Sequence, residues 1–397
     1  MRSRAASMDE DPATSRPGFE RPLRLVMYHD NRALGGSEAA LGVLVRHLHP
    51  GHRITIVGVD EDVVRWIGAH RPGVRTIVIR AVRDRRDVGA MAEHLRVFRA
   101  LRPDILQVNL PMAWSGRYAI LAGLLLRSAR LIAVDHSPLP AYSRGILRYR
   151  QLTIPREAAH VAVSTALARH VERLAKLPSG RVRVIYNGVE GTGPPPVERP
   201  RQAPPVVGVV ARLSREKGLD VFLRAMAELP QARSVIVGDG PERPQLEELA
   251  RTLCLTDRVT WTGWRDDVRD LLPSFDVFAL PSRAEGLPVT VVEAALAERP
   301  IVATEIGGIR EIVVPGETGL LVPPDDAGAL GRAIGNLLDD EEDARRMAGN
   351  ARARALGMFD PEEMANAYEA LYTEVLRGRR RRGPSGPVRG ERAPRGS

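Results

Sequence analysis

The sequence predicts an α/β protein with two Rossmann-like domains. Short β-branched runs alternate with helical patterns along most of the 397 residues, as in βαβ units with parallel sheets. The alternation stops once, at a proline-rich stretch over residues 190–205, and then starts again. The length fits this division, because one domain usually takes about 150 residues.

The first domain is expected over residues 21–189. Its first strand leads into a Gly35-Gly36-Ser37 turn and a helix from about 37 to 49, and helices separate the later strands. The expected strands are Leu23–Tyr28, Arg53–Val59, Val74–Ile79, Asp104–Asn109, Leu131–Val134, His160–Ser164 and Val182–Ile185.

The second domain is expected over residues 206–360, with residues 190–205 as the linker. Ligands of parallel sheets bind beyond the carboxyl ends of the strands, and two facing domains make the cleft between them the default site. The expected strands are Val206–Val210, Ser234–Val237, Val259–Trp261, Val277–Leu280 and Ile301–Ala303, and the expected closing helices are Asp325–Leu338, Glu341–Leu356 and Pro361–Leu376.

The basic charge is concentrated at one end of the chain. The net charge is +9, of which residues 377–397 carry +7, with eight arginines and one glutamate, while residues 1–20 carry −1 and residues 21–376 carry +3. Both ends are predicted to be disordered, because they offer too few apolar residues for a core. The arginine-rich tail is suited to contact an anionic membrane, at about 1 kcal/mol per arginine, and no specific nucleic-acid partner is expected.

The composition excludes several classes of protein. Cys254 is the single cysteine, which excludes a disulfide scaffold and a thiolate metal cluster. The longest apolar run, Ala119–Leu126, has eight residues, far fewer than the roughly 20 that span a bilayer. The N-terminus shows no signal-peptide pattern, and neither a P-loop nor an HExxH motif occurs. We expect a cytoplasmic protein that needs neither a metal nor another cofactor. Only its arginine-rich tail is expected to contact the membrane.

Residues 285–293, EGLPVTVVE, form the strongest motif and follow the expected strand Val277–Leu280. Pro288 is well placed as the first residue of a helix, whose N–H groups would make a site for a phosphate. Glu285 and Glu293 are then suited to accept hydrogen bonds from sugar hydroxyls on either side of a diphosphate. In the alternative interpretation Glu285 is only favoured by the helix dipole and Glu293 is solvated, although its apolar neighbours argue against solvation.

Two cations come earlier in the same half of the chain. Arg212 follows the expected strand Val206–Val210, and Lys217 is expected to open a helix over residues 217–229. A cation at a helix N-terminus is disfavoured by the macrodipole unless an anion is shared. Arginine binds phosphate oxygens bidentately and lysine supplies a point charge, so the pair is suited to stabilise a leaving diphosphate in place of a metal ion. The alternative is an exposed arginine and lysine in a surface loop.

Arg212 and Lys217, followed by Glu285 and Glu293 with seven residues between them, resemble the retaining family-4 glycosyltransferases with the GT-B fold. The resemblance covers residues 23–376 and is more specific in the second half. The other segments that carry it are Gly35–Glu38, Asp135–Ser137, Tyr186–Val189, Val237–Pro241, Gly263-Trp264, Pro281–Gly286 and Gly316–Leu320.

The resemblance implies the GT-B architecture, in which two Rossmann-like domains face a deep interdomain cleft. The acceptor would lie on the first domain and a nucleotide-diphosphate sugar on the second, with the helix over residues 361–376 packing back on the first. The implied reaction transfers a hexose-type sugar with retention to a hydroxyl of a glycan, a lipid-linked acceptor or a small molecule, and needs no metal. The residues that bind the acceptor are not identified.

The resemblance also implies roles for single residues. Arg212 and Lys217 would bind the donor diphosphate and stabilise the leaving group, and Glu285 would contact the transferred sugar. His136, at a strand end, would lie near the reacting sugar, although a lone histidine is often structural. Gly35 and Gly36 would allow the loop after the first strand to approach the phosphate and the acceptor closely. The other implied donor contacts are Gly286, Leu287 and Pro288 around the sugar, Glu293 at the ribose, Gly263 and Arg265 near the base, and Thr290.

Two other functions stay open from the residues. Another GT-B activity on a sugar nucleotide, such as 2-epimerisation, would need its own acid/base set, and no second carboxylate–histidine cluster is evident. The second alternative is a non-catalytic protein that binds a sugar or a polyanion. The presence of both cations and both glutamates of the motifs argues against this alternative.

Overall fold

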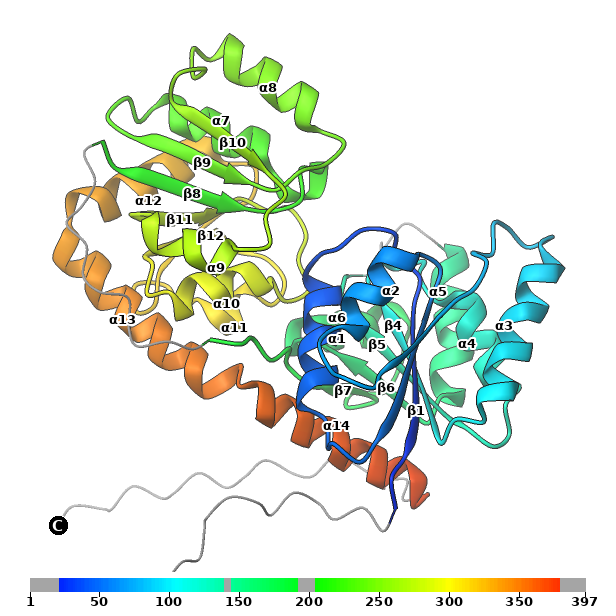
Figure 1. Cartoon of the computed structure of the whole chain (residues 1–397). Coiled ribbons are helices and arrows are strands. Elements are labelled where there is room, and N and C mark those ends of the chain that lie inside the picture. The colour runs from blue at the N-terminus through cyan, green and yellow to red at the C-terminus, as the bar shows by residue number, and fades with distance from the viewer. Residues whose placement is uncertain (1–20, 139–143, 192–203, 379–397) are drawn as a thin grey trace, which may run out of the picture.

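The computed structural model describes residues 21–138, 144–191 and 204–378. Two α/β domains lie next to each other, each built on one parallel sheet, and two consecutive helices at the C-terminal end run along both (Figure 1). This arrangement confirms the predicted two-domain α/β fold.

The segments for which disorder or a linker is predicted lie mostly outside the described residues. This holds for residues 1–20, for residues 192–203 of the proline-rich stretch, and for the arginine-rich tail from residue 379 onward.

The N-terminal sheet has seven parallel strands in the order β3-β2-β1-β4-β5-β6-β7. Leu25 of β1 pairs with Ile54 on one side and Ile105 on the other, which makes β1 an interior strand of the sheet. The strands are β1 (Arg24–His29), β2 (Arg53–Gly58), β3 (Arg75–Val78), β4 (Ile105–Leu110), β5 (Arg130–Asp135), β6 (Ala159–Ala162) and β7 (Val182–Val184).

Helices cover both faces of this sheet. Met27 packs in one apolar cluster with Leu41 of α1, and its neighbour Val26 packs in another with Phe98 of α3, because successive side chains of a strand point to opposite faces. The helices are α1 (Gly36–His47), α2 (Glu61–Gly68), α3 (Val88–Leu101), α4 (Arg117–Leu124), α5 (Arg144–Thr153) and α6 (Thr165–Leu174), with a 3₁₀ turn at Ile154–Arg156.

The C-terminal sheet has six parallel strands in the order β10-β9-β8-β11-β12-β13. The strands are β8 (Val206–Val210), β9 (Arg233–Val237), β10 (Val259–Gly263), β11 (Val277–Leu280), β12 (Ile301–Thr304) and β13 (Leu320–Val322). The strand β13 is missing from the sequence-based prediction, because its three residues lie between Gly319 and Pro323, in a stretch whose glycines and prolines are typical of a loop.

Helices also cover this second sheet, with α7 and α12 in contact and α10 against α13. They are α7 (Leu219–Ala227), α8 (Arg243–Thr252), α9 (Val268–Leu271), α10 (Val289–Leu296), α11 (Ile309–Ile312), α12 (Ala327–Asp339) and α13 (Glu341–Met358), with 3₁₀ turns at Arg215–Lys217 and Leu272–Ser274. The chain then continues into α14 (Pro361–Leu376).

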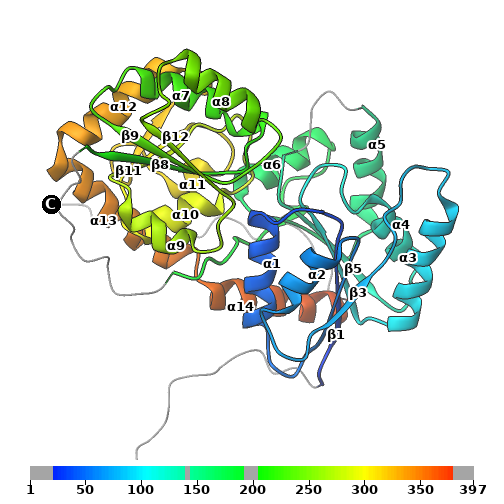
Figure 2. The ribbon, with the colours of Figure 1, turned by 45° about the horizontal axis from the view of Figure 1, so that its top comes forward.

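The last helix, α14, leaves the second domain and packs against α1 of the first (Figures 1 and 2). The hydroxyl of Tyr372 donates to Gln107 Oε1 at 2.6 Å, and Glu369 Oε1 accepts from the backbone N–H of His49 at 2.5 Å. Tyr372 and Glu369 are fully buried. The end of the described chain therefore completes the core of the first domain and holds the two domains together.

Candidate active site

The carboxyl ends of the two sheets meet at the boundary between the domains, and a glycine makes the closest approach. A Cβ atom on Gly286, after β11, would lie 2.1 Å from the backbone oxygen of His136, after β5. No side chain tolerates this distance, so the contact requires glycine. The carbonyl of Gly286 accepts hydrogen bonds from Ser164 Oγ at 2.9 Å and from the N–H of Gly308 at 3.1 Å. Backbone contacts of both domains thus converge here.

A carboxylate of the second domain caps a helix of the first. Glu311 accepts hydrogen bonds from the backbone N–H groups of Thr165 and Ala166, at 2.9 and 2.8 Å, at the start of α6. It also accepts from the hydroxyl of Tyr186 at 2.7 Å. A negative charge is favoured at a helix N-terminus by the unpaired N–H groups and by the macrodipole. This cap stabilises the relative placement of the two domains.

Lys217 and Glu285 form an ion pair on the second-domain side of the boundary. Lys217 Nζ donates to Glu285 Oε1 at 2.7 Å, and Ser282 Oγ donates to the same oxygen at 2.7 Å. The side chains are 24% and 8% exposed, so the pair is largely shielded from water. An ammonium group has three N–H donors, and this bond therefore leaves Lys217 with donors for an anion.

The loop over residues 215–218 is fixed onto the loop after β11. Arg283 donates from its backbone N–H to the carbonyl of Glu216 and from Nη1 to the carbonyl of Arg215, both at 2.7 Å. A Cβ atom on Gly218 would lie 2.1 Å from a backbone oxygen of the β11 loop. These contacts position the two members of the ion pair through the backbone.

The structure corrects the predicted start of the helix after Lys217. Residues 215–217 form a 3₁₀ turn, Gly218 has a left-handed φ of 66°, and α7 begins only at Leu219. Lys217 therefore does not lie at the first position of α7, where the helix dipole would disfavour its charge. Its ammonium group is balanced by the carboxylate of Glu285. Arg212 pairs with a different carboxylate: its side chain is 45% exposed, and its Nη2 lies 3.5 Å from Glu216 Oε1.

The N-terminus of α10 faces the first domain. The helix begins at Val289, with Pro288 as its N-cap rather than, as predicted, its first residue. Leu287 and Pro288 are buried and Thr290 is partly buried. A Cβ atom on Gly36, the first residue of α1, would lie 3.5 Å from a methyl group of Val289. The first turns of α1 and α10 therefore meet across the boundary.

Glu293 lies in the second turn of α10 and is not solvated, contrary to the alternative interpretation of the motif. Its side chain is 15% exposed, and its Oε1 lies 3.8 Å from Nε of Arg269 on α9. Burial raises the pKa of Glu293, and the guanidinium of Arg269 partly offsets this rise. The contact of Arg269 with Glu293 could not be predicted from the sequence, because Arg269 belongs to a short helix between two motifs and to neither of them.

Glu38 fixes the loop after β1. This residue of the first turn of α1 is fully buried, and its Oε1 lies 2.9 Å from His29 Nε2 and 2.9 Å from Asn31 Nδ2. Burial favours the neutral form, but the bonds from His29 and Asn31 outweigh it and lower the pKa of Glu38. Gly35 is the extended N-cap of α1. The loop that carries Gly35 and Gly36 is thus held by a buried carboxylate.

His136 lies at the boundary, beside the contact with Gly286. Its Nδ1 and Nε2 are buried, and neither has a hydrogen-bond partner among the residues that the structure describes. Burial lowers the pKa of His136 to about 4, and the neighbouring His29 adds to this effect. The ring is therefore neutral at pH 7 and offers one donor and one acceptor nitrogen to a ligand.

Next to His136, four buried charged groups form a network. Asp135 accepts from Arg150 Nη2 at 2.9 Å, its second oxygen lies 2.6 Å from His160 Nε2, and His160 Nδ1 lies 2.6 Å from Glu157 Oε2. Burial opposes the charge on His160, but Glu157 and Asp135 raise its pKa to about 9. Two cations and two carboxylates balance each other, so the network carries no net charge. Its ion pairs with Asp135 fix the carboxyl end of β5.

The implied base site lies at the end of β10. Gly263 has a φ of 71°, and its carbonyl accepts from the N–H of Gly238 at 2.8 Å. The Arg265 side chain is exposed and is bound by Asp267, which accepts from its Nε at 2.7 Å. Trp264 is 54% exposed. An exposed aromatic ring at this turn offers a face on which a nucleobase can stack.

Two residues of the first domain that the sequence analysis missed are exposed at the carboxyl edge of its sheet. Trp114 and Met112, on the loop after β4, are 50% and 47% exposed. The loop itself is fixed, because Ser137 Oγ donates to the carbonyl of Pro111 at 2.6 Å and Asp30 Oδ2 accepts from a backbone N–H of the loop at 2.7 Å. Their place directly after the expected strand Asp104–Asn109 is the sequence signal that could have indicated a role in ligand binding.

Within residues 21–138, 144–191 and 204–378, no group of three or more histidine, cysteine, aspartate or glutamate side chains is arranged to hold a metal ion. In the same part of the chain, no helix has both the length and the hydropathy needed to cross a bilayer. Metal independence, cytoplasmic location and contact of the tail with a membrane stay predictions.

Two family profiles match the chain, one in each domain. Residues 34–191 match "Glycosyltransferase Family 4", and residues 195–354 match "Glycosyl transferases group 1". The α-D-kanosaminyltransferase of Streptomyces kanamyceticus is 32% identical over 249 residues, which cover 58% of this chain and 64% of that protein. The 2-deoxystreptamine N-acetyl-D-glucosaminyltransferase of Streptomyces fradiae is 31% identical over 317 residues, which cover 70% of this chain and 73% of that protein.

The fold is similar to that of solved glycosyltransferase structures. HepE of Anabaena, in complex with UDP and glucose, superposes with a TM-score of 0.76 at 22% sequence identity, over 89% of this chain and 100% of that one. This similarity confirms the expected GT-B architecture.

We expect Gly286→Ala to lower the free energy of unfolding by about 1–3 kcal/mol, because the added methyl group meets the backbone oxygen of His136. The change is measured as a lower midpoint of denaturant unfolding. Gly357→Ala in α13 is the matched control: no atom lies within 4 Å of its Cβ position, and alanine favours a helix. A wild-type midpoint for Gly286→Ala would contradict the close approach of the two domains.

Proposed function

Since the chain belongs to the group 1, family-4 glycosyltransferases, we propose that it transfers a hexose-type sugar from a nucleotide-diphosphate sugar to an acceptor hydroxyl, with retention of anomeric configuration. The observation that carries the proposal is the shielded Lys217–Glu285 ion pair at a boundary to which the other domain contributes His136. A cation for phosphate, a carboxylate for sugar hydroxyls and a neutral imidazole are thereby available at one place.

The donor is proposed to lie along the carboxyl edge of the second sheet. Lys217 and the more exposed Arg212 would bind the diphosphate, helped by the N–H groups at the start of α10. Glu285 would accept hydrogen bonds from the transferred sugar, and Glu293 from the ribose, with Trp264 beside the base. HepE is bound to UDP and glucose in its solved structure, which supports a nucleotide-sugar donor for this chain.

The proposed reaction exchanges one bond at the anomeric carbon for another on the same face of the sugar. The bond from this carbon to the diphosphate oxygen breaks, and the acceptor oxygen forms the new bond. The acceptor proton passes to the leaving diphosphate, whose growing charge is stabilised by Lys217 and Arg212. The neutral ring of His136 would hold a hydroxyl of the transferred sugar without adding a charge.

The acceptor is proposed to enter along the loop after β4, where Trp114 and Met112 are exposed. The names of two relatives, the 2-deoxystreptamine N-acetyl-D-glucosaminyltransferase and the 2-deoxystreptamine glucosyltransferase of Streptomyces kanamyceticus, favour a small ring-shaped acceptor. An aromatic side chain on a fixed loop suits the apolar face of such a ring.

We expect Lys217→Ala and Glu285→Ala each to lower kcat/KM about 100- to 1000-fold, because each removes charge stabilisation or sugar contacts in a shielded site. Steady-state transfer assays with a nucleotide sugar measure the change, and circular dichroism checks the fold. Lys176→Ala, which alters the only other lysine, an exposed one, is the matched control and keeps wild-type activity. Near-normal turnover by either site variant would overturn the assignment.

Transfer is expected to continue in the presence of excess EDTA, because Lys217 and Arg212 take the part that a divalent metal plays in other transferases. The measurement compares initial rates before and after chelation, and again after magnesium is added back. Loss of activity with EDTA and recovery with magnesium would contradict the proposal of metal independence.

Trp114→Ala is expected to raise the KM for the acceptor about tenfold and to leave the KM for the donor unchanged, because base- or ring-stacking contacts of this size are worth about 1–3 kcal/mol. Trp66→Phe in α2, where the ring packs against His70, serves as the control. An unchanged acceptor KM in Trp114→Ala would show that the acceptor does not use this loop.

A further inference from the structure

Arg269 lies between a carboxylate of the candidate donor site and the segment that joins the two domains. Its Nε is 3.8 Å from Glu293 Oε1 on α10, and its Nη1 is 3.5 Å from Glu190 Oε2. Glu190 comes after β7, at the start of the proline-rich stretch. One guanidinium therefore bridges the second domain and the interdomain connection.

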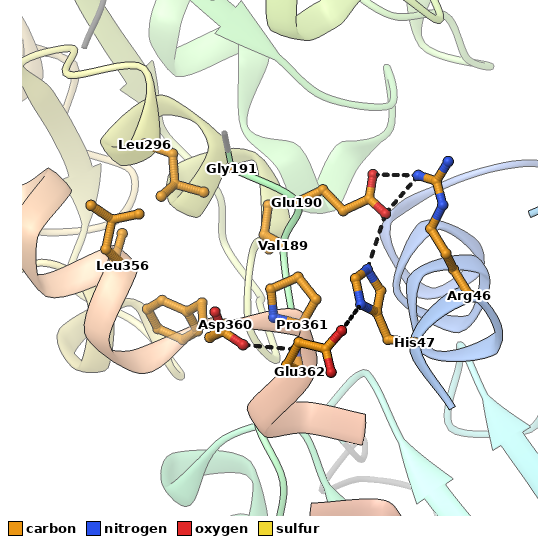
Figure 3. A pocket seen from close by; sticks show the side chains of 12 residues that line it. Arg46, His47, Val189, Glu190, Gly191, Leu296, Leu356, Asp360, Pro361 and Glu362 are labelled. Atoms are coloured by element: carbon orange, nitrogen blue, oxygen red, sulfur yellow. Dashed lines mark hydrogen bonds and ion pairs between the residues drawn. The ribbon is translucent and has the colours of Figure 1, made fainter. Parts of the chain in front are cut away.

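Glu190 is in turn held by the first domain. Arg46 Nη1 donates to both of its oxygens, at 2.8 and 2.9 Å, and His47 Nε2 lies 3.4 Å from Oε1 (Figure 3). The other ring nitrogen of His47 lies 2.9 Å from Glu362 on α14. Burial raises the pKa of Glu190, but Arg46 outweighs this effect, with His47 and Arg269, so that the pKa is lowered overall.

Glu190 and its partners Arg46 and His47, with Glu362, line a cavity of about 420 Å³ where the two domains and α14 come together (Figure 3). The opposite wall of the cavity is apolar and is formed by Val189, Leu296 and Phe359. The Glu190 carboxylate is held at this junction by Arg46 and His47 of the first domain and by Arg269 of the second.

The charged form of Glu293 depends on a neighbouring cation more than that of an exposed glutamate does. Its side chain is only 15% exposed, and burial disfavours a carboxylate unless a cation is near. Arg269 is the cation that forms an ion pair with it in the described part of the chain. Arg269 itself is 48% exposed, so each of its ion pairs is expected to be modest in strength.

We propose that Arg269 is a positioning residue for the donor: it orients the Glu293 carboxylate toward the ribose hydroxyls and is itself held in place by Glu190 at the interdomain junction. The inference rests on the proposed function, in which Glu293 binds the ribose. It adds a residue that touches neither the sugar nor the diphosphate and that makes ribose recognition depend on the segment connecting the domains.

The test compares ligands with and without ribose hydroxyls. The full chain is first titrated with UDP, GDP and ADP, and the tightest binder is then compared with its 2′,3′-dideoxy counterpart by calorimetry. In Arg269→Gln we expect the Kd of the ribonucleotide to rise about threefold to fivefold and that of the dideoxynucleotide to stay the same. Arg269→Lys keeps the charge and should restore much of the ribose preference. In transfer assays Arg269→Gln should raise the donor KM and leave kcat unchanged.

Two further variants test the connection through Glu190. Glu190→Gln should weaken ribonucleotide binding about twofold, and the double variant with Arg269→Gln should bind no worse than Arg269→Gln alone, because both act through one contact. Arg345→Gln is the matched control, since Arg345 forms an exposed ion pair with Glu341 within α13 and should bind as the wild type does. Additive effects of the two variants would overturn the role of Glu190.

Failure of the inference and failure of the proposed function give different results. If Glu293→Gln lowers the ribose preference and Arg269→Gln does not, or if Arg269→Gln weakens both nucleotides equally, the positioning role is wrong and the donor site stands. If Glu293→Gln leaves the ribose preference unchanged, or none of the three nucleotides binds, the proposed donor site is wrong, and the inference falls with it.

Discussion

The whole candidate site depends on one close approach of two backbones, the contact of Gly286 with the carbonyl of His136. Parallel sheets place every strand-to-helix loop at one edge, and here the two edges face each other with no room for a side chain at Gly286. The contact fixes where His136 lies relative to Glu285, although the two residues belong to different domains. The Glu311 cap on α6 supports the same placement with a charge at a helix N-terminus.

Two neighbouring histidines of the first domain show how surroundings decide protonation. The pKa of His136 is lowered to about 4 by burial, with no carboxylate bonded to its ring. His160 is fully buried, but it lies between Asp135 and Glu157, which raise its pKa to about 9. The charged histidine belongs to a neutral network that supports the strand, and the uncharged one faces the boundary, where a neutral donor or acceptor suits a sugar hydroxyl.

Much of the fold could be predicted from the sequence, because β-branched runs and helical periodicity are local signals. The strand β13 was not predicted, because the glycines and prolines on both sides of it are typical of a loop. The order of Arg212, Lys217, Glu285 and Glu293 also indicated the second-domain side of the site. Their contacts could not be predicted in the same way: the Lys217–Glu285 bond joins residues 68 positions apart, and it depends on how two loops are fixed together. The positions of Glu311 and Arg269 depend further on how the domains meet.

The packing of α14 on the first domain has a consequence for the order in which the protein folds. The bond between Tyr372 and Gln107 spans 265 positions of the chain. During synthesis the N-terminal sheet leaves the ribosome first, yet its core lacks Tyr368 and Tyr372 until almost all of the described chain has been made. Contacts at such sequence separation form late, because the intervening chain must first be ordered. The first domain to be translated is therefore the last to complete its native core.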